Sequence, residues 1–400
     1  MASMHEVPFE VHSNIRFGLI GAGERGRGLL NDLLACQGLE VKAIADTNQQ
    51  NIDLSTKQVI DARQQKPDIF IGHNAWQYLL EKDLDLVYIA TPWNTHTQFA
   101  VAAMQAGKHV GVEVPAAVTL KECWQLVEVS EQTQRHCVML ENCYYGYWEM
   151  LIKNMAKAGL FGTITHAECA YIHDMRHELF ADRSEGLWRR LPHITRDSNH
   201  YPTHGLGPVA KILGIGSEDA FDYLVSMSSL SAGLKEYSKL NIPSDDPRQQ
   251  ETYICGDMNT SLIRTKLGRT IVLQHGVTNP RPYDRNFLIG GTKGTFRDLP
   301  PRLYLDDAGK REEWLDLDNY KEQWEDSLWK KYGDQARKSG GHGGMDFILN
   351  YRLIQLMLQG LPPDMDVYDA AEWSVPGPLS EQSVRQKSAA ILFPDFRNKK

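Results

Sequence analysis

The sequence predicts an α/β fold in two parts: a doubly wound parallel sheet at the N-terminal end, then an α+β domain with an open, mainly antiparallel sheet. Three observations predict it. A glycine-rich turn joins an apolar run to a helical pattern near residue 20, strand-like and helix-like segments alternate from residue 15 to about 142, and strand-like runs follow one another beyond that point. We therefore place the two domains at residues 14–142 and 143–396.

The glycine-rich turn ends the first predicted strand. The apolar run 15–20 is typical of a buried parallel strand, and it leads into Gly21-x-Gly23-x-x-Gly26, followed by leucines at helical spacing. In such a turn the first glycine permits the bend, the second lets a pyrophosphate approach the backbone, and the third allows close packing of helix on strand. Free N–H groups at the helix N-terminus favour phosphate binding.

An acidic residue at the end of the second strand indicates which cofactor binds. The run 41–45 ends at Asp46, about twenty residues after the turn, as the Rossmann dinucleotide fingerprint requires. A carboxylate there accepts hydrogen bonds from the adenosine ribose 2′-hydroxyl and repels a 2′-phosphate. No Arg or Lys occurs at 47–50, so we predict NAD rather than NADP. The predicted cofactor contacts in this part are Gly21, Gly23, Glu24, Arg25, Gly26 and Asp46.

Composition and charge exclude several classes of partner. The 400 residues exceed what one core usually holds, and a formal net charge of −8 disfavours nucleic acid and anionic membranes. No apolar run is long enough for a transmembrane helix, and residues 1–14 lack the apolar core of a signal peptide. We expect a cytoplasmic protein as the sequence stands, or an exported one if a signal was trimmed. The six cysteines form no CxxC pair and are expected to be reduced and mostly buried.

The other elements follow from periodicity. In the first domain, helices are predicted at 52–64, 76–80, 98–106 and 119–130, and strands at 68–71, 85–90, 107–113 and 138–142. In the second, helices are predicted at 148–158 and 346–359, and strands at 162–172, 221–228, 252–256, 258–267, 269–276, 285–291 and 302–305, with a hairpin at Gly268. The polar segments 231–251 and 306–344 are predicted as loops or excursions from the sheet, with Gly340–Gly344 forming a loop over the site.

Two motifs of the first domain resemble the glucose–fructose oxidoreductase/inositol dehydrogenase (Gfo/Idh/MocA) family. Residues 90–96, Ala-Thr-Pro-Trp-Asn-Thr-His, are similar to that family's loop at the cofactor ribose and nicotinamide. The resemblance implies cofactor contacts from Thr91, Trp93 and His96. Residues 107–115, Gly-Lys-His-Val-Gly-Val-Glu-Val-Pro, are similar to the family's Glu-Lys-Pro motif.

Within the second motif, the resemblance implies that Glu113 contacts the nicotinamide ribose or the sugar. The lysine that helps to move the hydroxyl proton in the family's dehydrogenases is replaced by Val114. A simple sugar dehydrogenase is expected to keep that lysine.

Further motifs narrow the resemblance to glycoside hydrolase family 109, the NAD-dependent α-N-acetylgalactosaminidases. Similar motifs are long, occur in order and extend over nearly the whole chain from about residue 15 to 396; they lie at 113–117, 141–146, 170–174, 201–208, 221–229, 256–260, 280–283, 340–346 and 365–371. Two features depart from the family pattern. The twin-arginine export signal of many members is absent, and residues 143–148 around Tyr145 are altered, which bears on substrate preference.

The resemblance implies a reaction unlike two-carboxylate glycoside hydrolysis. NAD⁺ would take hydride from sugar C3, and the resulting ketone would acidify the C2 hydrogen. The aglycone would leave C1 by elimination, water would add, and the bound NADH would reduce C3 again. The implied substrate is a terminal N-acetylgalactosamine or related sugar, free or on a glycan, and the reaction needs no metal.

The resemblance also implies roles for individual side chains. His204 would act as base or proton relay at C3 or C2, and Tyr201 would join it in the catalytic group by binding substrate, on the same face if the segment is helical. Tyr145 would serve C2 proton transfer or leaving-group departure; as a base it would need a lowered pKa. The purely structural alternatives are a packed aromatic for Tyr145 and a buried structural histidine for His204.

Three more side chains complete the predicted site. Arg189 is expected to bind the sugar or its acetamide unless it forms a surface salt bridge, His342 to contact substrate, and Asn142 to contact the cofactor. His200 and His204 are four residues apart, but no convincing carboxylate partner accompanies them, so we predict no metal site.

Three functions stay open from the sequence: an NAD-dependent glycosidase, a sugar oxidoreductase with net redox turnover, and a non-catalytic NAD- and sugar-sensing protein. Val114 weakens the second, and the joint presence of Tyr145, Tyr201 and His204 weakens the third. Sugar oxidoreductases of this fold often pair through the open sheet face, so a homo-oligomer is expected.

Overall fold

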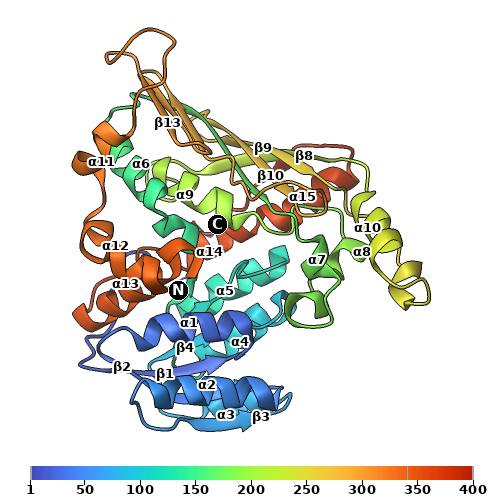
Figure 1. The fold of residues 1–400 in the computed structure, drawn as a ribbon. Helices are drawn as coiled ribbons and strands as arrows, with labels where there is room; N and C mark the ends of the chain where they lie inside the picture. Colours follow the sequence, from blue (N-terminus) through green and yellow to red (C-terminus); the bar gives the residue numbers. More distant parts are fainter. Residues whose placement is uncertain (1, 340, 399–400) are drawn as a thin grey trace. The chain divides into compact units, whose positions relative to one another are not determined.

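The computed structural model describes residues 2–339 and 341–398 and divides them into two compact units (Figure 1). The first unit takes residues 2–146, 327–339, 341–374 and 396–398, and the second takes 147–326 and 375–395. The units therefore differ from the predicted ranges 14–142 and 143–396, because residues 327–374 return to pack with the N-terminal part of the chain. A sequence boundary near residue 142 stays a prediction.

The first unit contains the predicted doubly wound parallel sheet, in the order β3-β2-β1-β4-β5-β6. Its strands are β1 (Ile15–Ile20), β2 (Leu39–Asp46), β3 (Asp68–Ile71), β4 (Leu86–Ile89), β5 (His109–Val112) and β6 (Cys137–Met139). The strand order reverses direction beside β1, so the carboxyl ends of β1 and β4 form the crevice where such sheets bind ligands.

Helices connect these strands, and the C-terminal segment adds more. They are α1 (Glu24–Leu34), α2 (Gln49–Asp61), α3 (Ala75–Leu80), α4 (Trp93–Gln105), α5 (Leu120–Thr133), the 3₁₀ turn η1 (Asn142–Tyr145), α12 (Ser327–Ser339), the 3₁₀ turn η4 (Gly341–Gly344), α13 (Met345–Gln359) and α14 (Val367–Ser374). The helix predicted to begin at Thr119 is confirmed: Thr119 is the N-cap of α5, and Glu122 completes a capping box. Helix α4 begins at Trp93, earlier than the predicted residue 98, because Pro92 supplies an extended N-cap directly before it.

The second unit contains the open sheet, in the order β13-β12-β11-β7-β10-β9-β8-β14. Its strands are β7 (Ile164–Ile172), β8 (Phe221–Ser228), β9 (Asn259–Thr265), β10 (Thr270–Gly276), β11 (Leu288–Gly291), β12 (Gly294–Arg297), β13 (Arg302–Leu305) and β14 (Ile391–Leu392). All neighbours pair antiparallel except β7 and β10, which are parallel. The predicted mainly antiparallel sheet is confirmed, and the hairpin between β9 and β10 turns at Gly268, whose φ is +86°.

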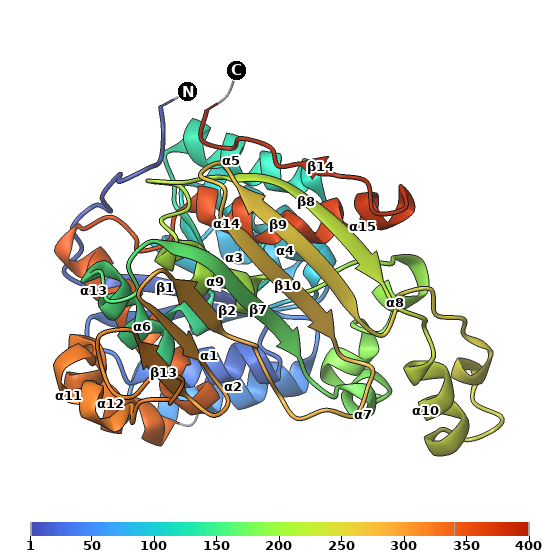
Figure 2. The ribbon, with the colours of Figure 1, turned by 90° about the horizontal axis from the view of Figure 1, so that it is seen from above.

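The helices of the second unit leave one broad face of this sheet open, and Figure 2 looks onto that face, with β8, β9, β10 and β7 side by side. They are α6 (Tyr147–Lys157), α7 (Arg176–Leu179), η2 (Ser184–Leu187), α8 (Pro192–Thr195), α9 (Thr203–Ile212), α10 (Gly233–Asn241), η3 (Pro247–Gln250), α11 (Asp318–Trp324) and α15 (Pro376–Arg385). Helix α9 packs on β7 at Gly205, where a Cβ would lie 2.6 Å from the backbone nitrogen of Ala170.

Three predictions about local structure are wrong. Residues 252–256 do not form a strand, and the segments 231–251 and 306–344 contain α10, η3, α11, α12 and η4 rather than loops alone. These helices are polar and bury few side chains; α10 buries Leu234 and Ser238. Polar and charged residues dominate these segments, and that composition favoured loops in the sequence-based prediction although the few apolar residues recur at helical spacing. Gly340 of the predicted loop lies outside the described residues.

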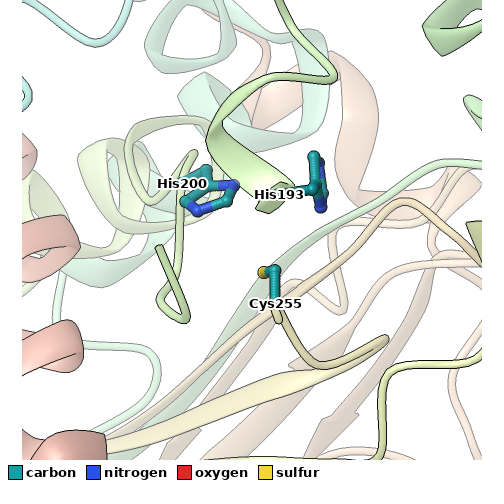
Figure 3. A group of neighbouring side chains, drawn as sticks. All are labelled: His193, His200 and Cys255. Atoms are coloured by element: carbon teal, nitrogen blue, oxygen red, sulfur yellow. The ribbon is translucent and has the colours of Figure 1, made fainter. Parts of the chain in front are cut away.

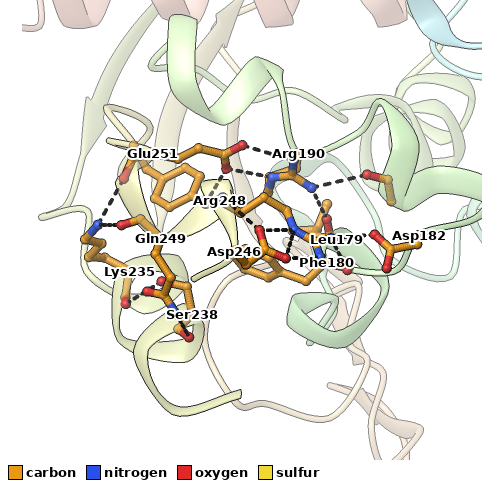
Figure 4. A network of polar contacts seen from close by, with 12 residues as sticks. Leu179, Phe180, Asp182, Arg190, Lys235, Ser238, Asp246, Arg248, Gln249 and Glu251 are labelled. Carbon is orange, nitrogen blue, oxygen red and sulfur yellow. Dashed lines mark hydrogen bonds and ion pairs between the residues drawn. The ribbon is translucent and has the colours of Figure 1, made fainter. Parts of the chain in front are cut away.

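A buried arginine network holds the 231–251 segment in place (Figure 4). Arg190 donates to both carboxylate oxygens of Glu251 and to the backbone carbonyl of Leu179. Arg248 pairs with Asp246 and donates to the carbonyl of Phe180. The network therefore ties this segment to α7 through charge-assisted hydrogen bonds.

Two further sequence predictions concern the cysteines and membrane-spanning helices. All six cysteines are free and buried. Among the described residues, no helix is both long and apolar enough to cross a bilayer.

Candidate functional site

The glycine turn has the geometry that a dinucleotide needs. Gly21 has φ +91°, and a Cβ there would lie 2.4 Å from the carbonyl oxygen of Ala90. A Cβ on Gly26 would lie 2.0 Å from the carbonyl oxygen of Gly21, so only glycine lets α1 start this close to β1. A Cβ on Gly23 would meet no atom within 4 Å, which leaves open space at the helix N-terminus for a pyrophosphate.

Asp46, at the end of β2, is hydrogen-bonded to the glycine turn before α1 and to the start of α2. Its Oδ2 accepts from the Ala22 backbone N–H at 2.6 Å, and its Oδ1 accepts from the Asn48 N–H at 2.7 Å. The carboxylate is thus held at the edge of the glycine turn, where the adenosine ribose is expected. Glu24 is exposed in the first turn of α1, so the cofactor contact predicted for it would come from its backbone N–H.

Arg25 links two carboxylates that are distant in sequence. Its Nε donates to Glu113 Oε1 at 2.7 Å, and its Nη1 and Nη2 donate to Asp346 at 2.6 and 3.2 Å. Burial alone would lower the pKa of Arg25, but the Glu113 and Asp346 carboxylates raise it well above its ordinary value. Arg25 is therefore a fixed cation that orients Glu113 at the end of β5. No role was predicted for Asp346, although it lies in a motif similar to the family's.

Asp346 also contacts two other residues of the predicted site, Asn142 and His342. It accepts from Asn142 Nδ2 at 2.7 Å and lies 2.8 Å from His342 Nδ1. The hydrogen bond to Asp346 raises the pKa of His342. Burial and the Asp346 charge raise the pKa of Asp32, in α1, to about 7. The structure thus brings Asn142, His342 and Arg25 together around one carboxylate, next to a second carboxyl that holds a proton near neutral pH.

The loop before α4 is braced by His96. Its Nδ1 lies 2.8 Å from the Pro115 carbonyl oxygen and its Nε2 lies 2.7 Å from the Thr91 carbonyl oxygen. Burial lowers the pKa of His96. Each ring nitrogen faces a backbone carbonyl oxygen, and the neutral imidazole donates to one of the two, so His96 positions the loop rather than pointing a nitrogen toward a cofactor. Trp93 is buried in the first turn of α4, and Thr91 Oγ1 lies 2.8 Å from Thr95 Oγ1.

Tyr145 is held by an ion pair that the sequence did not predict. Its hydroxyl donates to Asp364 Oδ2 at 3.0 Å, and Arg352 binds both oxygens of the same carboxylate at 2.8 and 2.9 Å. Burial and the Asp364 charge raise the pKa of Tyr145 well above 10. Tyr145 therefore keeps its proton at neutral pH, which favours proton donation over a base role.

The second unit assembles an aromatic and cationic cluster from Tyr171, Tyr201, His204 and Arg189. Tyr201 lies two residues before α9, and its hydroxyl is 3.5 Å from His204 Nε2. The ring of Tyr171, in β7, lies 4.6 Å from that of Tyr201 and 5.5 Å from that of His204. The close contact of Gly205 with Ala170 brings α9 and β7 near enough for these rings to meet.

Arg189 lies over the tyrosines of this cluster. Its guanidinium carbon is 4.8 Å from the Tyr201 ring centre and 5.7 Å from that of Tyr171, within cation–π range. It also pairs with Glu185 at 2.7 Å, but only 4% of it is exposed, so it is not a surface salt bridge. The neighbouring Arg190, fixed by the network in Figure 4, anchors the backbone that carries it.

Two aromatic neighbours, His173 and Tyr283, extend the cluster, and no role was predicted for either of them. The hydroxyl of Tyr171 lies 3.2 Å from His173 Nδ1, and Tyr283 meets both rings edge to face. Burial lowers the pKa of His173. Both residues lie in motifs quoted above, so the available signal was the clustering of Tyr and His in those motifs.

Two family models together match nearly the whole chain. Residues 15–141 match the family model "Oxidoreductase family, NAD-binding Rossmann fold", and residues 145–400 match "Glycosyl hydrolase 109, C-terminal domain". Together with the glycine turn and Asp46, the first match defines an NAD-binding protein of the Gfo/Idh/MocA type.

Curated relatives narrow the class to one family. The chain is 54% identical to a "Glycosyl hydrolase family 109 protein" of Solibacter usitatus (strain Ellin6076), over 98% of this chain and 91% of the relative. It is 43% identical to "Glycosyl hydrolase family 109 protein 1" of Shewanella sp. (strain MR-4), over 96% and 85%. The chain belongs to glycosyl hydrolase family 109, and it is an NAD-dependent enzyme of the glycosidase or sugar-oxidoreductase class.

Solved structures share the fold. An NAD binding oxidoreductase from Klebsiella pneumoniae aligns with a TM-score of 0.74 at 16% identity, over 96% of this chain and 100% of that chain. A levoglucosan dehydrogenase in complex with NADH and levoglucosan aligns with a TM-score of 0.72 at 18% identity, over 96% and 100%. At these identities the likeness concerns the fold alone.

Proposed function

We propose that this enzyme is an NAD-dependent glycosidase that removes a terminal α-linked N-acetylgalactosamine or a related sugar. The observation that carries the proposal is the Tyr201–His204 pair beneath the buried Arg189 guanidinium. It offers an imidazole for proton transfer, two aromatic rings for a sugar face, and a cation for an acetamide oxygen. The buried Val114, in place of the dehydrogenase lysine, supports the glycosidase over the oxidoreductase.

Residues of the first unit would hold the cofactor. The N–H groups after Gly23 would bind the pyrophosphate, Asp46 would accept from the adenosine ribose hydroxyls, and Glu113, oriented by Arg25, would bind the nicotinamide ribose. When bound, NAD supplies reversible hydride acceptance at C3 of the sugar. His96 supports the loop 91–96 by its two backbone contacts.

Residues of the second unit would bind the sugar and move its protons. His204 takes the proton of the C3 hydroxyl or the C2 hydrogen, and Tyr201, whose hydroxyl lies beside Nε2, orients that imidazole. Arg189 binds the acetamide. In this arrangement His204 can accept one proton from the sugar and return it later in the same turnover.

The bond changes at C1 and C2 follow from the acidity of the C2 hydrogen beside a C3 ketone. A base removes the C2 proton, the C2–H electrons form a C1–C2 double bond, and the C1–O bond breaks toward the aglycone. Tyr145, which keeps its proton, would donate it to the leaving oxygen. Water then adds to C1 and a proton returns to C2. His342 stays a predicted substrate contact.

The test is the reaction of a nitrophenyl N-acetyl-α-galactosaminide in D₂O without added cofactor. The expected product carries deuterium at C2, because that proton is removed and returned, and a substrate with a 3-O-methyl group is not cleaved. The position of the label is read by NMR and mass spectrometry. His204→Ala is expected to lose about 10²–10⁴-fold in turnover while it keeps its bound NAD.

The controls separate the competing functions. A two-carboxylate glycosidase run in parallel should retain protium at C2, and the free product sugar incubated without enzyme corrects for background exchange. Product without C2 deuterium in fully exchanged solvent would falsify the elimination mechanism. Net NADH formation with a free sugar would identify an oxidoreductase. A protein that neither cleaves the glycoside nor forms NADH would be identified as a sensor.

A further inference from the structure

Three ligand-type side chains meet in the second unit, apart from the aromatic and cationic cluster. They are His193 in α8, His200 between α8 and α9, and Cys255 between η3 and β9. One ligand atom of each lies within 4.8 Å of the others. Figure 3 shows the Cys255 side chain below the two imidazole rings, which lie edge to face with centroids 4.8 Å apart.

These groups are buried and short of hydrogen-bond partners. His193, His200 and Cys255 are 3%, 7% and 2% exposed. Nδ1 of His193 and both ring nitrogens of His200 have no hydrogen-bond partner among the described residues. A neutral imidazole carries one nitrogen lone pair that can bind a cation. Buried nitrogens without a partner cost free energy, and a bound cation removes that cost.

The backbone fixes the three segments against one another. The N–H groups of Ile254 and Cys255 both donate to the His193 carbonyl, at 3.0 and 3.1 Å. The N–H of Gly256 donates to Asp197 Oδ1 at 3.0 Å, and the Cys255 thiol donates to the Ser198 carbonyl at 3.7 Å. These hydrogen bonds hold the three ligand-bearing segments in fixed positions, as a metal site requires.

We propose that His193, His200 and Cys255 form a binding site for a d¹⁰ transition-metal ion, Zn²⁺ or Cu⁺. Two imidazoles and one thiolate are the ligand types that these ions share. Metal–ligand bonds of about 2.0–2.3 Å at tetrahedral or trigonal angles place two ligands of one ion about 3.3–3.8 Å apart. The three ligand atoms lie within 4.8 Å of one another, so side-chain rotations that bring them about 1 Å closer complete the site.

The balance of charge and protons follows from the ligand set. Binding releases the Cys255 thiol proton to solvent, and the metal supplies the energy to do so although burial raises the pKa of that thiol to about 12. Cu⁺ with one thiolate gives a neutral site with three ligands. Zn²⁺ leaves one positive charge, which the nearby Asp197 carboxylate offsets, and a water completes four ligands.

The sequence missed this group because its members come from three separate segments. The prediction considered His200 with His204 at helical spacing, whereas the structure pairs His200 with His193 and with a cysteine far along the chain. A bound ion would fix the segment between α8 and α9, which carries Tyr201 directly after His200.

The experiment uses the full chain, stripped with a chelator and titrated anaerobically with Co²⁺ as a spectroscopic probe. The expected result is one equivalent of Co²⁺ with a thiolate-to-metal charge-transfer band and tetrahedral visible bands. Zn²⁺ should displace it and raise the Tm of the protein by several degrees. A separate titration with Cu⁺ against a coloured Cu⁺ chelator distinguishes the two ions.

Variants assign the ligands. Cys255→Ser should lose the charge-transfer band, while Cys143→Ser and Cys169→Ser, at other buried cysteines, should keep it. His193→Asn and His200→Leu each remove one nitrogen ligand and should weaken binding at least tenfold. Absence of stoichiometric binding to the wild-type protein, full Co²⁺ binding by any folded ligand variant, or loss of the band in Cys143→Ser or Cys169→Ser overturns the proposal.

Discussion

Tyr145 shows how one neighbour decides the chemistry of a side chain. A tyrosine near a sugar could act as base or as acid. Its hydroxyl donates to Asp364, which Arg352 holds by two hydrogen bonds, and burial with the Asp364 charge raises its pKa. The ionised form is thus disfavoured twice, once by the loss of solvent and once by like charge.

We predict that Tyr145→Phe lowers kcat by about 10²–10⁴-fold, because the leaving oxygen loses its proton donor. Asp364→Asn removes the negative charge beside the hydroxyl and lowers the pKa of Tyr145. The alkaline limb of the kcat profile should then move to lower pH. Both effects are measured by release of the free sugar from an alkyl α-glycoside, whose alkoxide leaves only with a proton, at pH values from 6 to above 10, where the wild-type limb lies.

Tyr144→Phe is the matched control for the Tyr145→Phe and Asp364→Asn variants, because it removes a hydroxyl from the neighbouring ring. The ring centroids of Tyr144 and Tyr145 lie 4.8 Å apart. It should change kcat little. An Asp364→Asn profile that superimposes on the wild type, or a Tyr145→Phe variant with full turnover, contradicts the assignment.

The glycines of α1 and of the turn before it are needed for two different reasons, packing and ligand binding. Gly26 is required by packing, because its Cβ position lies 2.0 Å from backbone, whereas Gly23 faces open space and has φ −63°. A third glycine, Gly28, is exposed in the helix with no atom near its Cβ position. One short element therefore separates a fold requirement from a ligand requirement.

We predict that Gly23→Ala keeps the Tm of the protein without cofactor but weakens NAD binding at least tenfold, because the methyl group occupies the pyrophosphate space. Gly26→Ala should lower both, with a stability loss of about 1–3 kcal/mol from overpacking. Calorimetric titration with NAD and thermal unfolding measure the two effects.

Gly28→Ala is the control, and it should bind NAD normally and gain about 0.5–1 kcal/mol of stability, the usual advantage of alanine in a helix. If Gly23→Ala binds NAD as tightly as the wild type, the pyrophosphate does not lie at this turn.

In the molecule as a whole, distant parts of the chain share one unit. Helix α13 packs against α1, and its Asp346 reaches Arg25, Asn142 and His342. Asp32 of α1 is buried beside the same carboxylate, which raises its pKa from 3.8 to about 7. The C-terminal return is thus joined to the N-terminal sheet by a cluster of titrating groups.

This cluster predicts a pH dependence of stability. Between pH 3.8 and about 7 the folded Asp32 binds a proton that the unfolded chain has released. Stability therefore falls as pH rises through this window, by at most about 4 kcal/mol for this group. Asp32→Asn should remove that term, so the Tm of the variant relative to the wild type rises by several degrees from pH 4.5 to 7.5, measured with saturating NAD.

Asp53→Asn, at an exposed position of α2, serves as the control and should leave the curve parallel to that of the wild type. A wild-type and an Asp32→Asn curve that stay parallel across the window would show that Asp32 titrates as an ordinary carboxyl.

The homo-oligomer remains a prediction, and it would form through the open face of the second sheet. Val225, Leu262 and Val272 lie opposite one another on β8, β9 and β10, and Leu262 is 49% exposed. An apolar row of this kind across three strands is suited to a second copy of the chain.

The sequence by itself determined the elements whose signals are local. The apolar run of β1, the glycine spacing and the acidic end of β2 specify a Rossmann unit within about thirty residues, and Thr119 with Glu122 specifies the start of α5. Long ordered motifs also led to the family, and so to NAD and the candidate residues Tyr201, His204 and Arg189. Polar helices such as α10 were not predicted, because their polar and charged composition is also typical of loops.

Only the tertiary structure decided which residues meet. Asp346 joins Arg25, Asp364 joins Tyr145, and Cys255 joins His193, each pair separated by long stretches of chain. Such contacts depend on how β-strands and helices pack, and packing responds to shape and volume that periodicity does not encode. The protonation of Tyr145 and Asp32 was equally beyond the sequence, because a pKa is set by burial and by charges that folding brings near.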